Sequence, residues 1–176
     1  MLDRFSTNLT QLTGLLSFAA TTIACLIAAL RSGSRDAPTW RLLALINCLL
    51  LIETISGLRY QIHNLVKAKL EAEGLYTQMH GWIQEIINIS IAIIALIFVT
   101  LFLLRRQVGG GAVRVAVSMT IVVVALFAIE TVSLHELRAV IYQPIGPVVM
   151  IGWLWAIAAA GICLAAVGVT RSWRRP

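Results

Sequence analysis

The chain has 176 residues, of which 59% are hydrophobic and only 12% are charged, and its mean hydropathy is +0.88. A soluble domain of this length carries a larger charged fraction, so the composition excludes one and indicates that lipid covers the surplus apolar surface. The net charge of +6 is better explained by arginines beside membrane spans than by a nucleic-acid-binding face, and we expect no nucleic-acid partner.

Five apolar runs are each long enough for a transmembrane helix, which needs about 20 residues. Breakers separate them: SGSRDAP after the first run, GGG after the third, and a turn with two prolines and a glycine after the fourth. We expect the first run to be a mature helix, because it is as long as a full span and lacks a signal-peptide exit site. The sequence therefore predicts an all-α, polytopic transmembrane helix bundle, a single integral membrane domain of residues 1–176 with spans at about 12–31, 41–63, 82–105, 112–137 and 147–170.

Basic residues alternate between the connections in a way that orients the chain. The first and third connections and the C-terminal tail carry nine of the 14 basic residues and one acid, Asp36, whereas the remaining side carries five basic and seven acidic residues. Because positive charge gathers on the cytoplasmic side, the pattern predicts an N-out, C-in protein of the inner (cytoplasmic) membrane. Trp40 and Trp173 fit the inner interface, and Trp82 fits the outer one.

The segment after the second span contains no obvious helix breaker. Between Leu58 and Glu73 there is neither glycine nor proline, and good helix formers dominate. We expect the second helix to run unbroken from Arg41 to Glu73, turn at Gly74 and return directly into the third span. This extended helix 2–helix 3 hairpin would protrude on the outer side, because about 33 residues of helix exceed the hydrocarbon thickness.

Polar residues that are costly in lipid gather toward the outer ends of the predicted spans. An intramembrane carboxylate costs about 2.5–3.5 kcal/mol on insertion scales, so Glu53 and Glu130 require an explanation. Counting helical rise from the cytoplasmic arginines places the three histidines near one level, with these two glutamates deeper. The candidate intramembrane polar cluster comprises Glu53, Tyr60, His63, His80, Glu85, Glu130 and His135.

The predicted hairpin gives this cluster two specific contacts. On an unbroken second helix, Glu53, Gly57 and Tyr60 fall on one polar stripe, which continues through Asn64 and Lys67. If Gly74 is the apex, His63 and Glu85 are equally distant from it and pair across the two helices. Alternatively, each buried glutamate is satisfied by a structural partner, for instance Glu53 by a nearby serine and Glu130 by Arg138.

A metal or haem site is one possible use of the cluster. The di-iron motif Glu-x-x-His is absent. His80 and Glu85, like Glu130 and His135, are five residues apart, which turns the two side chains about 140° from each other on a regular helix. This argues against a one-ion site on a single helix, but two of the three histidines are able to flank a haem. Haem, pigment or metal binding stays open beside simple interfacial hydrogen bonding by the histidines.

The fifth span is rich in small residues. Gly152 with Ala156, and Gly161 with Ala165, make two small-xxx-small steps of the kind that allows close helix approach in lipid. The partner helix is either another helix of this chain or a helix of another subunit.

Catalytic motifs are absent: the sequence has no P-loop, GxSxG, HExxH or CxxCH. We therefore do not expect an enzyme, and predict a non-catalytic integral subunit of a larger inner-membrane assembly, such as an energy-converting or transport complex. Its partners would be the lipid bilayer and either other membrane subunits or copies of itself. The alternatives are a haem- or metal-binding redox protein that uses the outward His/Glu cluster, and an ion-conducting homo-oligomer lined by Glu53 and Glu130.

Overall fold

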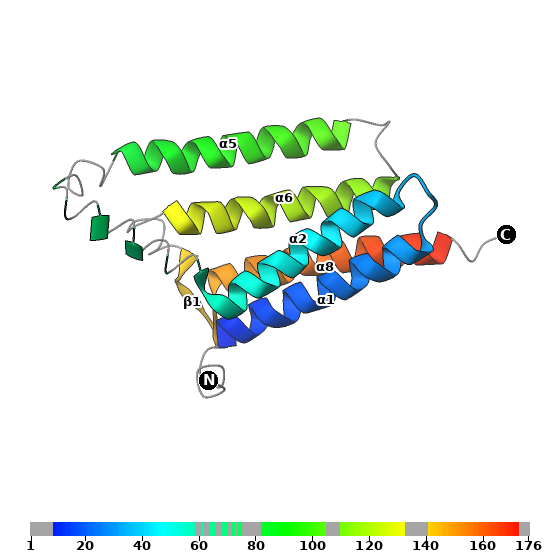
Figure 1. The fold of residues 1–176 in the computed structure, drawn as a ribbon, viewed down its shortest axis with the longest axis horizontal. Helices are drawn as coiled ribbons and strands as arrows, with labels where there is room; N and C mark the ends of the chain where they lie inside the picture. Colours follow the sequence, from blue (N-terminus) through cyan, green and yellow to red (C-terminus); the bar gives the residue numbers. More distant parts are fainter. Residues whose placement is uncertain are drawn as a thin grey trace.

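A computed structural model describes residues 9–58, 61, 64–65, 68–69, 72, 74, 82–104, 110–132 and 141–172. Within these ranges five long helices form, and a short antiparallel β-hairpin precedes the last of them (Figure 1). The elements are α1 (Leu9–Arg31), α2 (Ala37–Ser56), α5 (Trp82–Leu104), α6 (Gly111–Val132), β1 (Pro144–Ile145), β2 (Val148–Val149) and α8 (Met150–Ser172).

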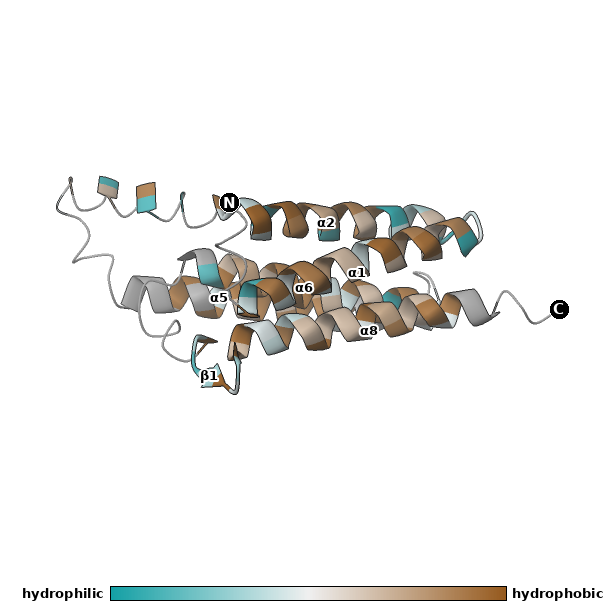
Figure 2. Cartoon of the chain, turned by 90° about the horizontal axis from the view of Figure 1, so that it is seen from below, coloured by the Kyte–Doolittle hydropathy of each residue, from teal (hydrophilic) through white to brown (hydrophobic). Residues whose placement is uncertain are grey.

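Four of the helices, α1, α2, α6 and α8, are long and apolar enough to cross a membrane. The fifth, α5, has 23 residues, and its apolar stretch within the described side chains runs from Ile89 to Leu101. Large apolar side chains are exposed along every one of these helices, as at Leu30, and hydrophobic residues cover their length (Figure 2). Such a surface suits lipid rather than water. The predicted all-α membrane bundle is confirmed, whereas the count of five spans and the N-out orientation stay predictions.

The helices form a four-helix bundle with α5 on its outside. α1 packs against α2 on one side and α8 on the other, and α6 packs against α8 and, less extensively, against α2. α5 lies along α6 (Figure 1). α1 and α8 end, and α2 and α6 begin, at the same end of the bundle. We call it the arginine end, because it holds Arg31, Arg35, Arg41 and Arg114.

A tight turn at the arginine end joins α1 to α2. The amides of Asp36 and Ala37 both donate to the carbonyl of Gly33 at 3.1 Å, and Pro38 occupies the first turn of α2, where its missing N–H costs nothing. The Asp36 carboxylate accepts the N–H of Gly110, at 3.5 Å, directly before α6. This contact ties the first connection to the start of the fourth predicted span.

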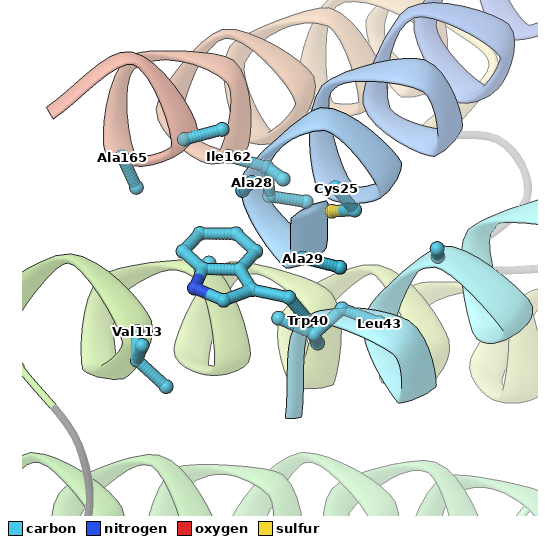
Figure 3. Packing of buried hydrophobic residues seen from close by; sticks show 11 residues of the cluster. Cys25, Ala28, Ala29, Trp40, Leu43, Val113, Ile162 and Ala165 are labelled. Carbon is cyan, nitrogen blue, oxygen red and sulfur yellow. The ribbon is translucent and has the colours of Figure 1, made fainter. Parts of the chain in front are cut away.

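Trp40 fills the interior of the bundle near the arginine end. Its indole is fully buried and lies between the helices, as Figure 3 shows. The prediction that Trp40 anchors the bundle at the lipid interface is therefore wrong, because the ring points inward at that level. Small side chains make the room for it: Ala28 and Ala29 of α1, Ala44 of α2, Ala116 of α6, and Ala165 and Ala166 of α8.

A second core lies toward the opposite end and is built from aromatic rings. Phe127 of α6 stacks on Trp155 of α8 with ring centroids 5.4 Å apart, and Phe18 of α1 meets Phe127 edge-on at 5.5 Å. Gly14 of α1 allows this packing, since a Cβ there would lie 2.9 Å from two ring carbons of Trp155. Three of the four bundle helices are joined through these rings.

A β-hairpin connects the end of α6 to α8. Pro144 pairs with Val149 and Ile145 with Val148, and Gly146 takes a left-handed φ of 70° in the turn. The amide of Val149 donates to the hydroxyl of Thr10 at 3.1 Å, which ties the hairpin to the start of α1. Because the hairpin occupies residues 144–149, α8 begins three residues later than the predicted fifth span.

The prediction of an unbroken second helix is wrong at Gly57. α2 ends at Ser56, and Gly57 adopts a left-handed conformation (φ 62°, ψ 31°) with its N–H donating to the Glu53 carbonyl at 2.7 Å. Glycine enters this conformation at no steric cost, and so it ends the helix before the breaker-free segment begins. The described residues that follow are helical and exposed: Leu58, Gln61, Asn64, Leu65, Ala68, Lys69 and Ala72.

Candidate functional site

The structure describes two side chains of the predicted polar cluster, Glu53 and Glu130. Glu85 lies in the first turn of α5, where only its backbone is described. Tyr60, His63, His80 and His135 lie outside the described residues, so convergence of the histidines and the His63–Glu85 pair stay predictions. α2 ends at Ser56, before Gly57, and Tyr60 lies outside the described residues, so the polar stripe through Glu53 and Tyr60 stays a prediction.

Glu130 is buried at the end of α6 that lies away from the arginines. It is only 6% exposed, and its Oε1 accepts a hydrogen bond from the Tyr142 hydroxyl. Tyr142 stands just before the β-hairpin, so the bond joins α6 to the connection that leads into α8. A carboxylate and a phenol held in this way satisfy each other's hydrogen-bonding groups away from water.

Tyr142 is the partner that sequence reasoning missed. On a fourth helix that continued that far, Tyr142 would share a face with His135 and turn away from Glu130. A helix of 12 further residues would place Tyr142 about 18 Å above Glu130. Their contact therefore shows that Tyr142 does not continue the helical rise of α6. The alternative partner, Arg138, lies outside the described residues.

Glu53 is half-buried in the last turn of α2, and its Oε2 is shielded from solvent. The Ser56 hydroxyl donates to the main-chain carbonyl of Glu53 at 3.3 Å. In the same turn, the Gln11 amide donates to the Thr54 carbonyl at 3.1 Å. Carbonyls in a last helical turn have no partner within their own helix, so α1 supplies one here across the helix–helix contact.

A polar pair also joins α1 and α2 in the middle of the bundle. The hydroxyl of Thr21 lies 2.9 Å from Asn47 Oδ1, and both residues are buried. The Asn47 amide group donates to the Leu43 carbonyl at 2.8 Å, which fixes its orientation. The signal for this pair in the sequence is an asparagine inside an apolar run. Such a pair fastens two helices where lipid offers no competing partner.

No group of three or more histidine, cysteine, aspartate or glutamate residues that could hold a metal ion occurs in the part of the chain that the structure describes. All three histidines lie outside that part, so haem, pigment or metal binding stays a prediction. Within the described residues, the buried Glu130 carboxylate of α6 is held against the Tyr142 phenol. The Glu53 carboxylate of α2 is partly shielded from solvent.

The small residues of α8 are used within the chain at three of the four predicted positions. A Cβ on Gly152 would lie 3.1 Å from the Thr10 side chain of α1, and one on Gly161 would lie 3.2 Å from Met119 of α6. Ala165 is buried beside Trp40. Ala156 is half-buried. These positions let α8 approach α1 and α6 closely, as the intramolecular alternative expects.

No family model matches the chain, and no curated protein or solved structure is significantly similar to it.

Proposed function

We propose that the protein is a non-catalytic integral subunit of a larger membrane assembly, of an energy-converting or transport type. The observation that carries the proposal is the place of α5 outside the four-helix bundle. α5 lies against α6, and none of its described side chains is buried.

The exposed surface of α5 is apolar on nearly all sides. Within the described side chains, the half-buried positions Ile91, Ala95 and Val99 are four residues apart and make the one stripe that fits against α6. Its exposed large side chains are Ile86, Ile87, Ile89, Ile93, Ile94, Leu96, Ile97, Phe98 and Leu101. The other four helices each bury a face within the chain, so among the described side chains α5 offers the most unburied surface to another membrane protein.

Site-specific photo-crosslinking tests the proposal. A photoreactive residue in place of Ile97 on α5 should give adducts with another polypeptide in native membranes, and the protein extracted in mild detergent should elute larger than one chain. The matched control replaces Leu49, which is at least as exposed on α2; it should give adducts chiefly with lipid. A single chain in detergent, together with no protein adduct from position 97, would overturn the proposal.

The proposal places the arginine end in the cytoplasm, following the distribution of charge. Thiol labelling tests this orientation in a variant whose three native cysteines are replaced by alanine. Ser34→Cys lies in the exposed turn between α1 and α2, and Gln143→Cys lies exposed beside the β-hairpin. A membrane-impermeant reagent should label position 143 in intact cells and position 34 only after permeabilisation. The reverse order would show that the orientation is wrong.

A further inference from the structure

Three exposed arginines surround the turn between α1 and α2. Arg31 ends α1, Arg35 lies in the turn, and Arg41 lies in the second turn of α2. The one acid in this stretch, Asp36, is half-buried, and its carboxylate accepts the N–H of Gly110. The turn therefore presents a net positive surface at the level where a helix leaves the membrane. Guanidinium groups are suited to phosphate, because their fork of N–H donors matches its oxygens.

Farther along α1 and α2 from these arginines, each of the two helices carries a line of exposed apolar side chains, its apolar stripe. On α2, Leu45 and Ile52 follow Arg41 at spacings of four and seven residues, which keeps all three within about 40° of one another around the helix. On α1, Leu16, Ile23 and Leu30 are seven residues apart. All five apolar side chains are exposed, Leu30 by 83%. Because α1 and α2 pack against each other, the stripes belong to neighbouring helices that share one charged turn.

We infer that the α1–α2 hairpin binds an anionic diacyl phospholipid, with the phosphate among Arg31, Arg35 and Arg41 and the acyl chains along the two apolar stripes. Charge complementarity selects an anionic headgroup over a zwitterionic one, and the stripes select a lipid over a free phosphate. The site is independent of the proposed subunit role, since it lies on α1 and α2 rather than on α5.

Native mass spectrometry of the detergent-solubilised full chain, titrated with diacyl phosphatidylglycerol or phosphatidylcholine, tests the inference. Each arginine near an anionic lipid contributes about fivefold in affinity, so Arg35→Gln/Arg41→Gln should weaken phosphatidylglycerol binding about thirtyfold. The matched control, Arg174→Gln/Arg175→Gln, removes the same charge from the C-terminal tail and should change binding less than about threefold. Arg35→Lys/Arg41→Lys keeps the charge and should retain most of the binding.

Three results would overturn the inference. Equal binding of phosphatidylcholine and phosphatidylglycerol would show that the site does not select an anionic headgroup. This comparison uses only the unaltered protein, so it does not depend on whether a variant folds. Equal losses in the two glutamine variants would indicate diffuse attraction rather than a site at the turn. Displacement of phosphatidylglycerol by millimolar inorganic phosphate would show that the arginines bind a free anion without the apolar stripes.

Discussion

Replacing Trp40 with alanine removes the side chain around which the arginine end of the bundle is packed. The indole is fully buried, and the cluster around it is rich in alanines from α1, α2, α6 and α8, whose side chains are too short to fill the space. Lipid is as apolar as this interior, so the cost arises from lost packing rather than from transfer out of water. A cavity of about 140 Å³ at about 24 cal/mol per Å³ predicts a loss of about 3 kcal/mol in the free energy of unfolding.

Unfolding in mixed micelles at rising SDS fraction, followed by far-UV circular dichroism, measures this loss. Trp40→Phe is the matched control. The indole Nε1 has no hydrogen-bond partner in the described structure, so phenylalanine gives up volume but no bond and should cost less than about 1.5 kcal/mol. An interface anchor would behave differently, with both variants close to the unaltered protein. A loss below about 1 kcal/mol for Trp40→Ala would refute the packing argument.

Three further outcomes are expected. Gly14→Ala should destabilise the bundle by about 1–3 kcal/mol in the same unfolding assay, because its Cβ would press on the ring of Trp155; an unchanged midpoint would contradict the close approach. Tyr142→Phe should cost about 1.5–3 kcal/mol, and a double-mutant cycle with Glu130→Ala, which removes the acceptor, should show coupling, whereas additive losses would mean that the two side chains do not interact. If two of the histidines bind haem, the protein purified from its native membrane will show a Soret band; no such band and no stoichiometric metal would end the cofactor hypothesis.

Apolar run length was enough to find the helices, because a membrane sets both their length and their composition. The predicted first residue of a helix is less accurate where a charged residue was used to define it. The second span was expected from Arg41, but α2 begins at Ala37, since Pro38 fits a first helical turn and the turn bonds to Gly33 precede it. Hydropathy alone does not register such bonds.

Contacts between helices required knowledge of which helices are neighbours. Asn47 is visible in the sequence as a polar residue in an apolar run, but its partner Thr21 lies 26 residues away on another helix. Glu130 could be recognised as costly, yet its bond to Tyr142 depends on where the chain turns after α6. Periodicity places a residue on a face of its own helix, and it says nothing about the helix opposite.

The small residues of α8 illustrate why a small-xxx-small motif does not identify the helix that packs against it. Gly152 and Gly161 permit close approach equally well to a helix of this chain or of another, and here α1 and α6 take those positions. A motif satisfied within the chain is no longer available to a second subunit on the same face. The surface left for assembly is then the large, branched, exposed one on α5, which lacks glycine altogether. Association through α5 would therefore rely on the interdigitation of isoleucine, leucine and phenylalanine side chains rather than on backbone approach, and alanine replacements at Ile94 and Ile97 should weaken it more than replacements at Leu45 on α2.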